Sequence, residues 1–201
     1  MTVVLGYHGC DKETAQNLLG GSSFTFSKKP YDWLGGGAYF WEWDLVRAYE
    51  WAQKHKKESA SVIGAAIDLG NCLDLTTRTG AQAIERAYQS YVIHQERQGL
   101  SLLANEDGKG NPGDLSLRYL DRAVITHLHE AMKEARLAEY DTVRALFPEG
   151  KELYPGAGFL KETHVQLAVR KNEQIRGVFR IPDHELSLFS IPGDIYDFKR
   201  S

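Results

Sequence analysis

The chain has 201 residues, 42% of them hydrophobic and 25% charged, with a formal net charge of −3. This length fits one globular domain with room for an insertion, and we find no run approaching the ~20 apolar residues that a membrane span needs. The charge gives no protein-wide attraction to nucleic acid, although a local basic groove is compatible with it. The sequence shows no signal-peptide pattern, so we expect a cytoplasmic protein without a membrane partner.

The two cysteines, Cys10 and Cys72, are too few for a disulfide framework and fit free thiols in a reducing compartment. Cys10 lies near His8, so a thiolate–imidazole pair is one interpretation, but small buried residues are the preferred one. The spacings of Cys and His do not resemble a metal site, and we expect no metal.

The first quarter of the chain predicts a strand, a helix and a long loop. Residues 3–7 form a hydrophobic run that predicts a buried strand ending at His8-Gly9. Asp11 is a predicted N-cap for a helix through about Leu19. Residues 22–37 are polar and rich in turn formers, and a long loop inside a compact domain is often functional.

The rest of the chain alternates strands with two longer helices. We predict strands at residues 38–43, 61–69, 71–76, 142–147, 164–170 and 175–181, and helices at 45–56 (capped by Asp44), 80–98 and 115–137. Residues 78–137 therefore look like a helical insertion within a β-rich chain. The predicted fold class is α+β.

The most informative motif is a glycine triplet, Gly35 to Gly37, that runs into Tyr39-Phe40. Glycine accepts positive φ and lets a ligand approach the backbone closely, and aromatic rings offer flat faces for stacking. Together with His8-Gly9, this segment indicates a site for a planar, ring-containing ligand.

The order of these motifs resembles the ADP-ribosyltransferase superfamily, in the branch that contains diphtheria toxin and the poly(ADP-ribose) polymerases. That branch carries a His-Gly pair, a Gly-x-Gly-x-Tyr-Phe segment, a second tyrosine in the next helix, and a glutamate at the start of a later strand. The matches here are His8-Gly9, the segment from Gly35 to Phe40, and Tyr49. The resemblance covers the first fifty residues well and residues 159–181 in part, whereas residues 78–137 have no clear counterpart.

The resemblance implies a single ADP-ribosyltransferase-like domain over residues 1–201, with a split β-sheet core and a helical insertion. It implies an enzyme that transfers ADP-ribose from NAD to a macromolecule and releases nicotinamide, with NAD as substrate and no metal. It also implies a toxin of a bacterial toxin–antitoxin or phage-defence system, with an antitoxin protein as a partner. In the family, the loop before the third motif helps to select the acceptor. Here that loop carries Lys151, Tyr154, Phe159 and Lys161, which slightly favours nucleic acid, including RNA, over protein.

The family roles can be transferred residue by residue. The backbone of Gly9 would hold the carboxamide of nicotinamide, and Tyr39 and Tyr49 would sandwich the ring. His8 would bond the adenosine-side ribose, with Gly37 and Phe40 completing the binding segment.

The third motif departs from the family pattern, because Gln166 stands where the glutamate is expected. An amide is not a carboxylate base, but its carbonyl accepts a hydrogen bond and would stabilise an oxocarbenium-like sugar through the 2′-hydroxyl. On a strand, Glu162, His164 and Gln166 would share a face, so Glu162 or His164 is an alternative source of charge or base. The expected catalytic residues are His8, Tyr39, Gln166 and Glu162. Alternatives to transfer are an NAD glycohydrolase and a non-catalytic NAD- or ADP-ribose-binding module.

Overall fold

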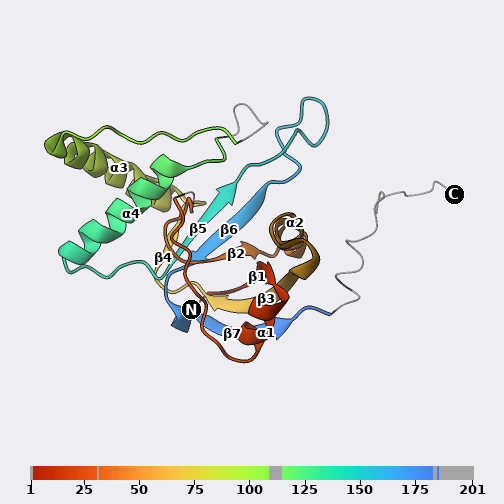
Figure 1. Ribbon diagram of the computed structural model, residues 1–201. Helices are drawn as coiled ribbons and strands as arrows, with labels where there is room; N and C mark the ends of the chain where they lie inside the picture. The colour runs from red at the N-terminus through yellow and green to blue at the C-terminus, as the bar shows by residue number, and fades with distance from the viewer. Residues whose placement is uncertain (1, 31, 109–114, 183–184, 186–201) are drawn as a thin grey trace.

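The computed structural model describes residues 2–30, 32–108, 115–182 and 185, and these residues form a seven-stranded sheet flanked by helices (Figure 1). The strand order is β4-β5-β6-β2-β1-β3-β7, in which only β4 and β5 run parallel. The strands are β1 (Val3–Asp11), β2 (Ala38–Glu42), β3 (Ala60–Asp68), β4 (Cys72–Asp74), β5 (Thr142–Phe147), β6 (His164–Val169) and β7 (Ile175–Arg180). The helices are α1 (Lys12–Leu19), α2 (Leu45–Lys56), α3 (Arg78–Gln98) and α4 (Tyr119–Glu134), with short 3-10 turns at Lys57–Ser59 and Asn172–Gln174.

The predicted α+β class is confirmed, and each predicted strand and helix is present with shifts of a few residues at its ends. One boundary is wrong: β1 does not end at His8-Gly9 but continues to Asp11. The reason is its partner, since β1 pairs with β3 along its whole length, through Asp11 opposite Ala60. The His-Gly motif thus lies inside a strand.

Helix starts follow the capping residues that the sequence offers. The carboxylate of Asp11 accepts a hydrogen bond from the Thr14 amide at 2.8 Å, and that of Asp44 accepts one from the Arg47 amide at 2.9 Å. Each satisfies one of the amides that a helix leaves unpaired at its first turn. Both predicted N-caps are confirmed.

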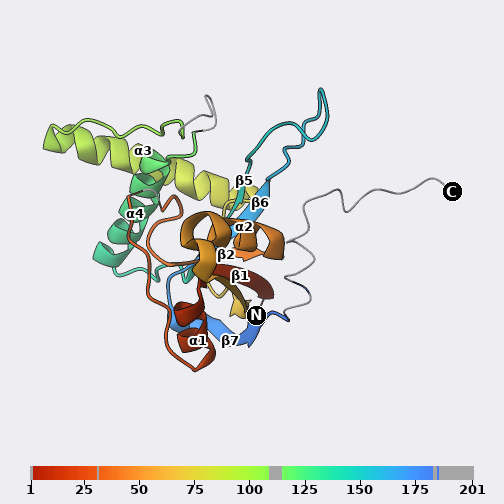
Figure 2. The same cartoon turned by 45° about the vertical axis from the view of Figure 1, so that its right-hand side comes forward.

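The two faces of the sheet carry different cores. One face holds a cluster built around Cys10, Phe40, Ile63 and Leu167, and α1 supplies Ala15 and Leu18 to it. On the opposite face, α2 covers the β1–β3 end through Ala48 and Ala52, whereas α4 covers the β5–β6 end through Ile125. Figure 2 shows α2 over the middle of the sheet and the α3–α4 pair beside it.

Helices α3 and α4 occupy the predicted helical insertion, between β4 and β5. They pack on each other through Ala87, Tyr91 and Val124. The loop after α1 runs alongside α4 in both views, with the Gly35 backbone against Ile125 (Figures 1 and 2). The insertion is therefore attached to the glycine segment that the sequence singled out.

Candidate functional site

The three strands that carry the sequence motifs lie side by side, in the order β1, β2, β6. The ladder between β1 and β2 contains Gly6 opposite Glu42 and Tyr7 opposite Trp41, and it stops there. The next residues along each strand are His8-Gly9 and Phe40-Tyr39. The backbone pairing of the two central strands therefore ends just before the motif residues.

Gly9 turns its backbone polar groups toward β2, beyond the end of this ladder. The Leu5 carbonyl accepts a hydrogen bond from the Trp43 amide at 3.0 Å, so Leu5 faces β2 with its polar backbone groups. Backbone orientation repeats every second residue in an antiparallel pair, which turns the amide and carbonyl of Gly9 toward β2 as well. The same register would give the Tyr39 carbonyl to the Gly9 amide, but His8 Nδ1 takes that carbonyl at 2.8 Å.

The hydrogen bond of His8 fixes its protonation. Burial lowers the pKa of His8, so the imidazole is neutral near neutral pH. A neutral ring that donates from Nδ1 to the Tyr39 carbonyl carries its lone pair on Nε2. The ring lies against Phe24 and Phe40, with centroid distances of 5.4 and 5.5 Å. His8 Nε2 is therefore an oriented acceptor.

Gly9 is also required for packing. A Cβ atom at this position would lie 2.5 Å from the Ala48 carbonyl oxygen and 3.1 Å from the Trp51 ring, both on α2. The missing side chain allows α2 to sit directly on β1. The close packing of α2 on β1 thus depends on this glycine.

Tyr39 points away from His8, toward the glycine loop. Its hydroxyl accepts from the Leu34 amide at 3.0 Å and donates to the Gly35 carbonyl at 2.8 Å. Burial, with a smaller effect of Asp32, raises the pKa of Tyr39 well above its ordinary value. The phenol is thus a neutral anchor for the loop, and its ring forms part of the floor beneath α4.

The two tyrosines of the expected sandwich lie in different clusters. Tyr39 packs in the hydrophobic cluster that contains Leu34 and Ile125. Tyr49, on α2, packs in the cluster that contains Trp41 of β2. Tyr49 also receives a hydrogen bond from Gln53. Both tyrosines belong to the face that α2 and α4 share, but the structure does not pair their rings.

Gln166 is held by hydrogen bonds at both ends of its amide. The Trp33 indole nitrogen donates to its Oε1 at 2.7 Å, and its Nε2 donates to His164 Nε2 at 2.9 Å. His164 Nδ1 in turn donates to the Glu162 carbonyl at 2.7 Å. Burial lowers the pKa of His164, which keeps this ring neutral. The chain of bonds fixes which end of the amide is the carbonyl.

Trp33 is a site residue that the sequence reasoning missed. The signal was present, because Trp33 stands two residues before the glycine triplet, but its partner lies 133 positions away along the chain. A contact over that distance follows from the docking of the loop on β6 and not from any local pattern.

Glu162 is placed differently from the expectation. It precedes β6, its side chain is half exposed, and its carboxylate lies 3.8 Å from Arg47 on α2. Arg47 also pairs with Glu149 at 2.6 Å. The Glu162 side chain thus interacts with Arg47 of α2. Only its backbone carbonyl takes part in the hydrogen-bond chain that holds Gln166.

Phe40 and Gly37 contribute to the packing of β2 and not directly to ligand contact. Phe40 is fully buried on the His8 face of the sheet. A Cβ atom at Gly37 would lie 2.8 Å from the Val169 carbonyl oxygen, and the Gly37 backbone pairs with Ser27. Both residues position β2 relative to its neighbours.

Cys10 lies on the His8 face, and burial raises the pKa of its thiol to about 11. Both cysteines are free, with Cys10 buried and Cys72 only partly buried, so a small buried residue describes Cys10 better than a thiolate–imidazole pair does. Among the described residues, no three His, Cys, Asp or Glu side chains gather as a metal site would require. In the same part of the chain, no helix is both long enough and apolar enough to cross a membrane.

The comparisons with known proteins give no relative: no family model, curated protein or solved structure matches this chain.

Proposed function

We propose that this protein transfers ADP-ribose from NAD to a macromolecular acceptor and releases nicotinamide. One observation carries the proposal: the β1–β2 ladder ends before His8-Gly9, and His8 Nδ1 takes the Tyr39 carbonyl that would otherwise pair with the Gly9 amide. A carboxamide offers one donor group and one acceptor, which complement one backbone amide and one carbonyl. Nicotinamide is a planar ring with that substituent.

The neighbouring groups suit the rest of NAD. His8 Nε2 is an acceptor for a ribose hydroxyl, because Nδ1 is already bound to the Tyr39 carbonyl. Gln166 lies on β6, the strand next to β2. Its carbonyl has two lone pairs, and Trp33 uses one of them. The second is available for the 2′-hydroxyl of the nicotinamide ribose.

The chemistry follows from these groups. The bond between C1′ of the ribose and the ring nitrogen breaks, and nicotinamide leaves as a neutral molecule with the electron pair. Positive charge develops on the sugar, where a fixed carbonyl dipole stabilises it. The acceptor then supplies a lone pair to C1′.

Gln166 is a neutral amide, so it does not remove a proton from the acceptor. This favours an acceptor whose attacking atom already carries a lone pair or negative charge, such as a phosphate oxygen or a base nitrogen of a nucleic acid. A toxin role in bacteria, restrained by an antitoxin, would be a consequence of such modification.

The second candidate function is NAD or ADP-ribose binding without transfer. It is favoured by the hydrogen bonds that already hold both ends of the Gln166 amide, from Trp33 and to His164. A carboxylate that polarises the sugar more strongly is missing from this position.

The fate of labelled NAD separates these functions. The purified protein is incubated with a bacterial extract and NAD labelled in its adenylate part, and label is measured on RNA, DNA and protein. Transfer predicts label on a macromolecule together with free nicotinamide. Free ADP-ribose alone would indicate a glycohydrolase, and intact bound NAD would indicate the binding module.

A further inference from the structure

We propose that Arg118 and Arg122 form a phosphate-binding subsite next to Gln166, on the side away from His8. This subsite rests on the proposed function, because its phosphate would belong to NAD or to a nucleic-acid acceptor. The two arginines lie four residues apart at the start of α4, so they share one face of the helix. They give the helical insertion a role in the site.

Arg118 is stacked on the aromatic groups around the third motif. Its guanidinium carbon lies 5.0 Å from the centre of the Trp33 ring and 4.4 Å from that of Phe147. Trp33 donates to Gln166, and Phe147 stacks on His164 with 5.3 Å between ring centroids. Each ring under Arg118 therefore touches a member of the Gln166 chain.

Stacking leaves the edge of a guanidinium for in-plane hydrogen bonds. The Nη1 atom of Arg118 lies 3.3 Å from Asp121, while its Nε is buried without a hydrogen-bond partner. The planar fork is thus held against the two rings, which also contact each other, and still has donor capacity.

Arg122 is the less satisfied of the two. Among the described residues, its one hydrogen-bond partner is the Lys28 carbonyl, at 3.4 Å, and its Nε is buried without a partner. Within the described residues, no carboxylate comes within ion-pair distance of it. Burial raises the pKa of Tyr39, and the positive charge of Arg122 acts in the opposite direction as a smaller effect. A poorly partnered guanidinium one helical turn from Arg118 calls for an anion.

The sheet order fixes the side on which this anion binds. His8 lies on β1, Gln166 on β6, and Phe147 on β5, with β2 between β1 and β6. The register places the Gln166 and Phe147 side chains on the face of the sheet opposite to His8, which is also the face that α4 covers. The ligand is a phosphate ester, because two guanidinium forks match phosphate oxygens. It comes from the pyrophosphate of NAD or from the backbone of a nucleic-acid acceptor.

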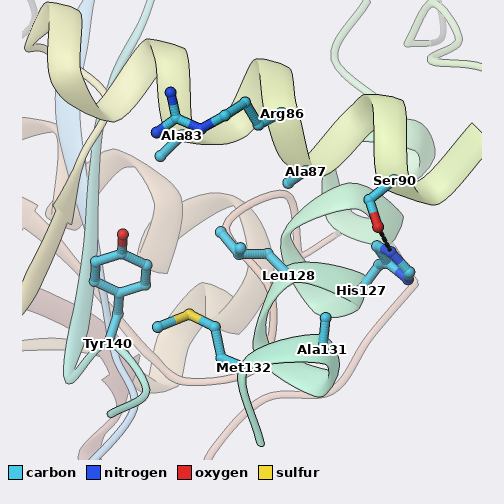
Figure 3. A pocket seen from close by; sticks show the side chains of 9 residues that line it. All are labelled: Ala83, Arg86, Ala87, Ser90, His127, Leu128, Ala131, Met132 and Tyr140. Carbon is cyan, nitrogen blue, oxygen red and sulfur yellow. Dashed lines mark hydrogen bonds between the residues drawn. The ribbon is translucent and has the colours of Figure 1, made fainter. Parts of the chain in front are cut away.

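The test measures binding to the full chain and to two variants, Arg118→Gln and Arg122→Gln. The ligands are inorganic pyrophosphate, ADP-ribose and a single-stranded oligonucleotide. Arg86→Gln is the matched control, because Arg86 is an exposed arginine of the same insertion that lines the separate α3–α4 pocket, of about 320 Å³ (Figure 3). Thermal melts report whether the variants remain folded.

We expect each variant to weaken pyrophosphate binding about tenfold, as loss of a charge-assisted hydrogen bond implies, with Arg86→Gln unchanged. A parallel loss for ADP-ribose assigns the subsite to the donor, and a loss for the oligonucleotide assigns it to the acceptor. Equal binding of all three ligands by folded Arg122→Gln and wild type overturns the inference, as does a wild type that binds none of them. If pyrophosphate binding depends on the arginines but NAD stays intact, the subsite stands and the transfer proposal fails.

Discussion

Replacing Gln166 by glutamate probes the hydrogen-bond chain at the third motif. The substitution has the same shape and places a carboxylate at this position. In the wild type, Nε2 of Gln166 donates to His164 Nε2 at 2.9 Å. In Gln166→Glu, a carboxylate oxygen faces the lone pair of a neutral imidazole, and an attractive contact becomes a repulsive one.

The cost is worked from that contact. Leaving buried hydrogen-bonding groups unsatisfied costs about 1–3 kcal/mol, which for a chain of this size lowers Tm by about 2–4 °C per kcal/mol. Protonation of His164 repairs the contact, so the pKa of His164 in the folded variant rises. A group with a raised folded-state pKa stabilises at low pH and loses that contribution as pH rises through it. In the wild type, burial lowers the pKa of His164, so stability falls as the ring is forced to charge at low pH.

The assay is the melting temperature of both proteins at about pH 5.5 and about pH 8, on either side of the ordinary histidine pKa. We expect the variant to be less stable at the higher pH and the gap to narrow at the lower one. Gln89→Glu, the same change at an exposed position of α3, serves as the control. A gap that does not change with pH would refute the hydrogen-bond chain.

Three further predictions concern the neighbouring residues. Gly9→Ala places a Cβ atom 2.5 Å from the Ala48 carbonyl oxygen and should destabilise the fold by about 1–3 kcal/mol in a denaturant titration; Gly177→Ala, which meets no atom within 4 Å, should not, and equal midpoints would contradict the packing of α2 on β1. Tyr39→Phe removes the bonds to Leu34 and Gly35 and should lower stability by about 1 kcal/mol and raise KM for NAD, because the glycine loop loosens; unchanged stability and KM would argue against the anchor. Cys10, buried and with a pKa of about 11, should react with a thiol reagent at neutral pH only after unfolding, and rapid labelling of the folded chain would show that it is accessible.

Most of the fold could be predicted from the sequence, because its signals are local. The N-cap residues Asp11 and Asp44 predict the starts of two helices, and the aliphatic runs predict the strands. The end of β1 was misplaced because a glycine usually breaks a strand, whereas here it admits α2. The pairing of β1 with β3 through Asp11 depends on the partner strand, so the residues around His8 carry no sequence signal for it.

The candidate site could be predicted only in part. The sequence pointed to His8, Tyr39 and Gln166, which do lie on three adjacent strands. It did not show that Tyr39 and Tyr49 pack apart, or that Glu162 turns to Arg47. The sequence reasoning also missed Trp33 and Arg118, because their contacts with the third motif join segments that are distant in sequence.

The most direct test of the central claim is the Gly9 amide resonance of the ¹⁵N-labelled protein during titration with nicotinamide and with NAD. If the Gly9 backbone binds the carboxamide, the chemical shift of the Gly9 amide changes strongly with both ligands, while that of Gly177 at the sheet edge does not. Saturating NAD that leaves the Gly9 resonance unmoved would contradict the proposed site.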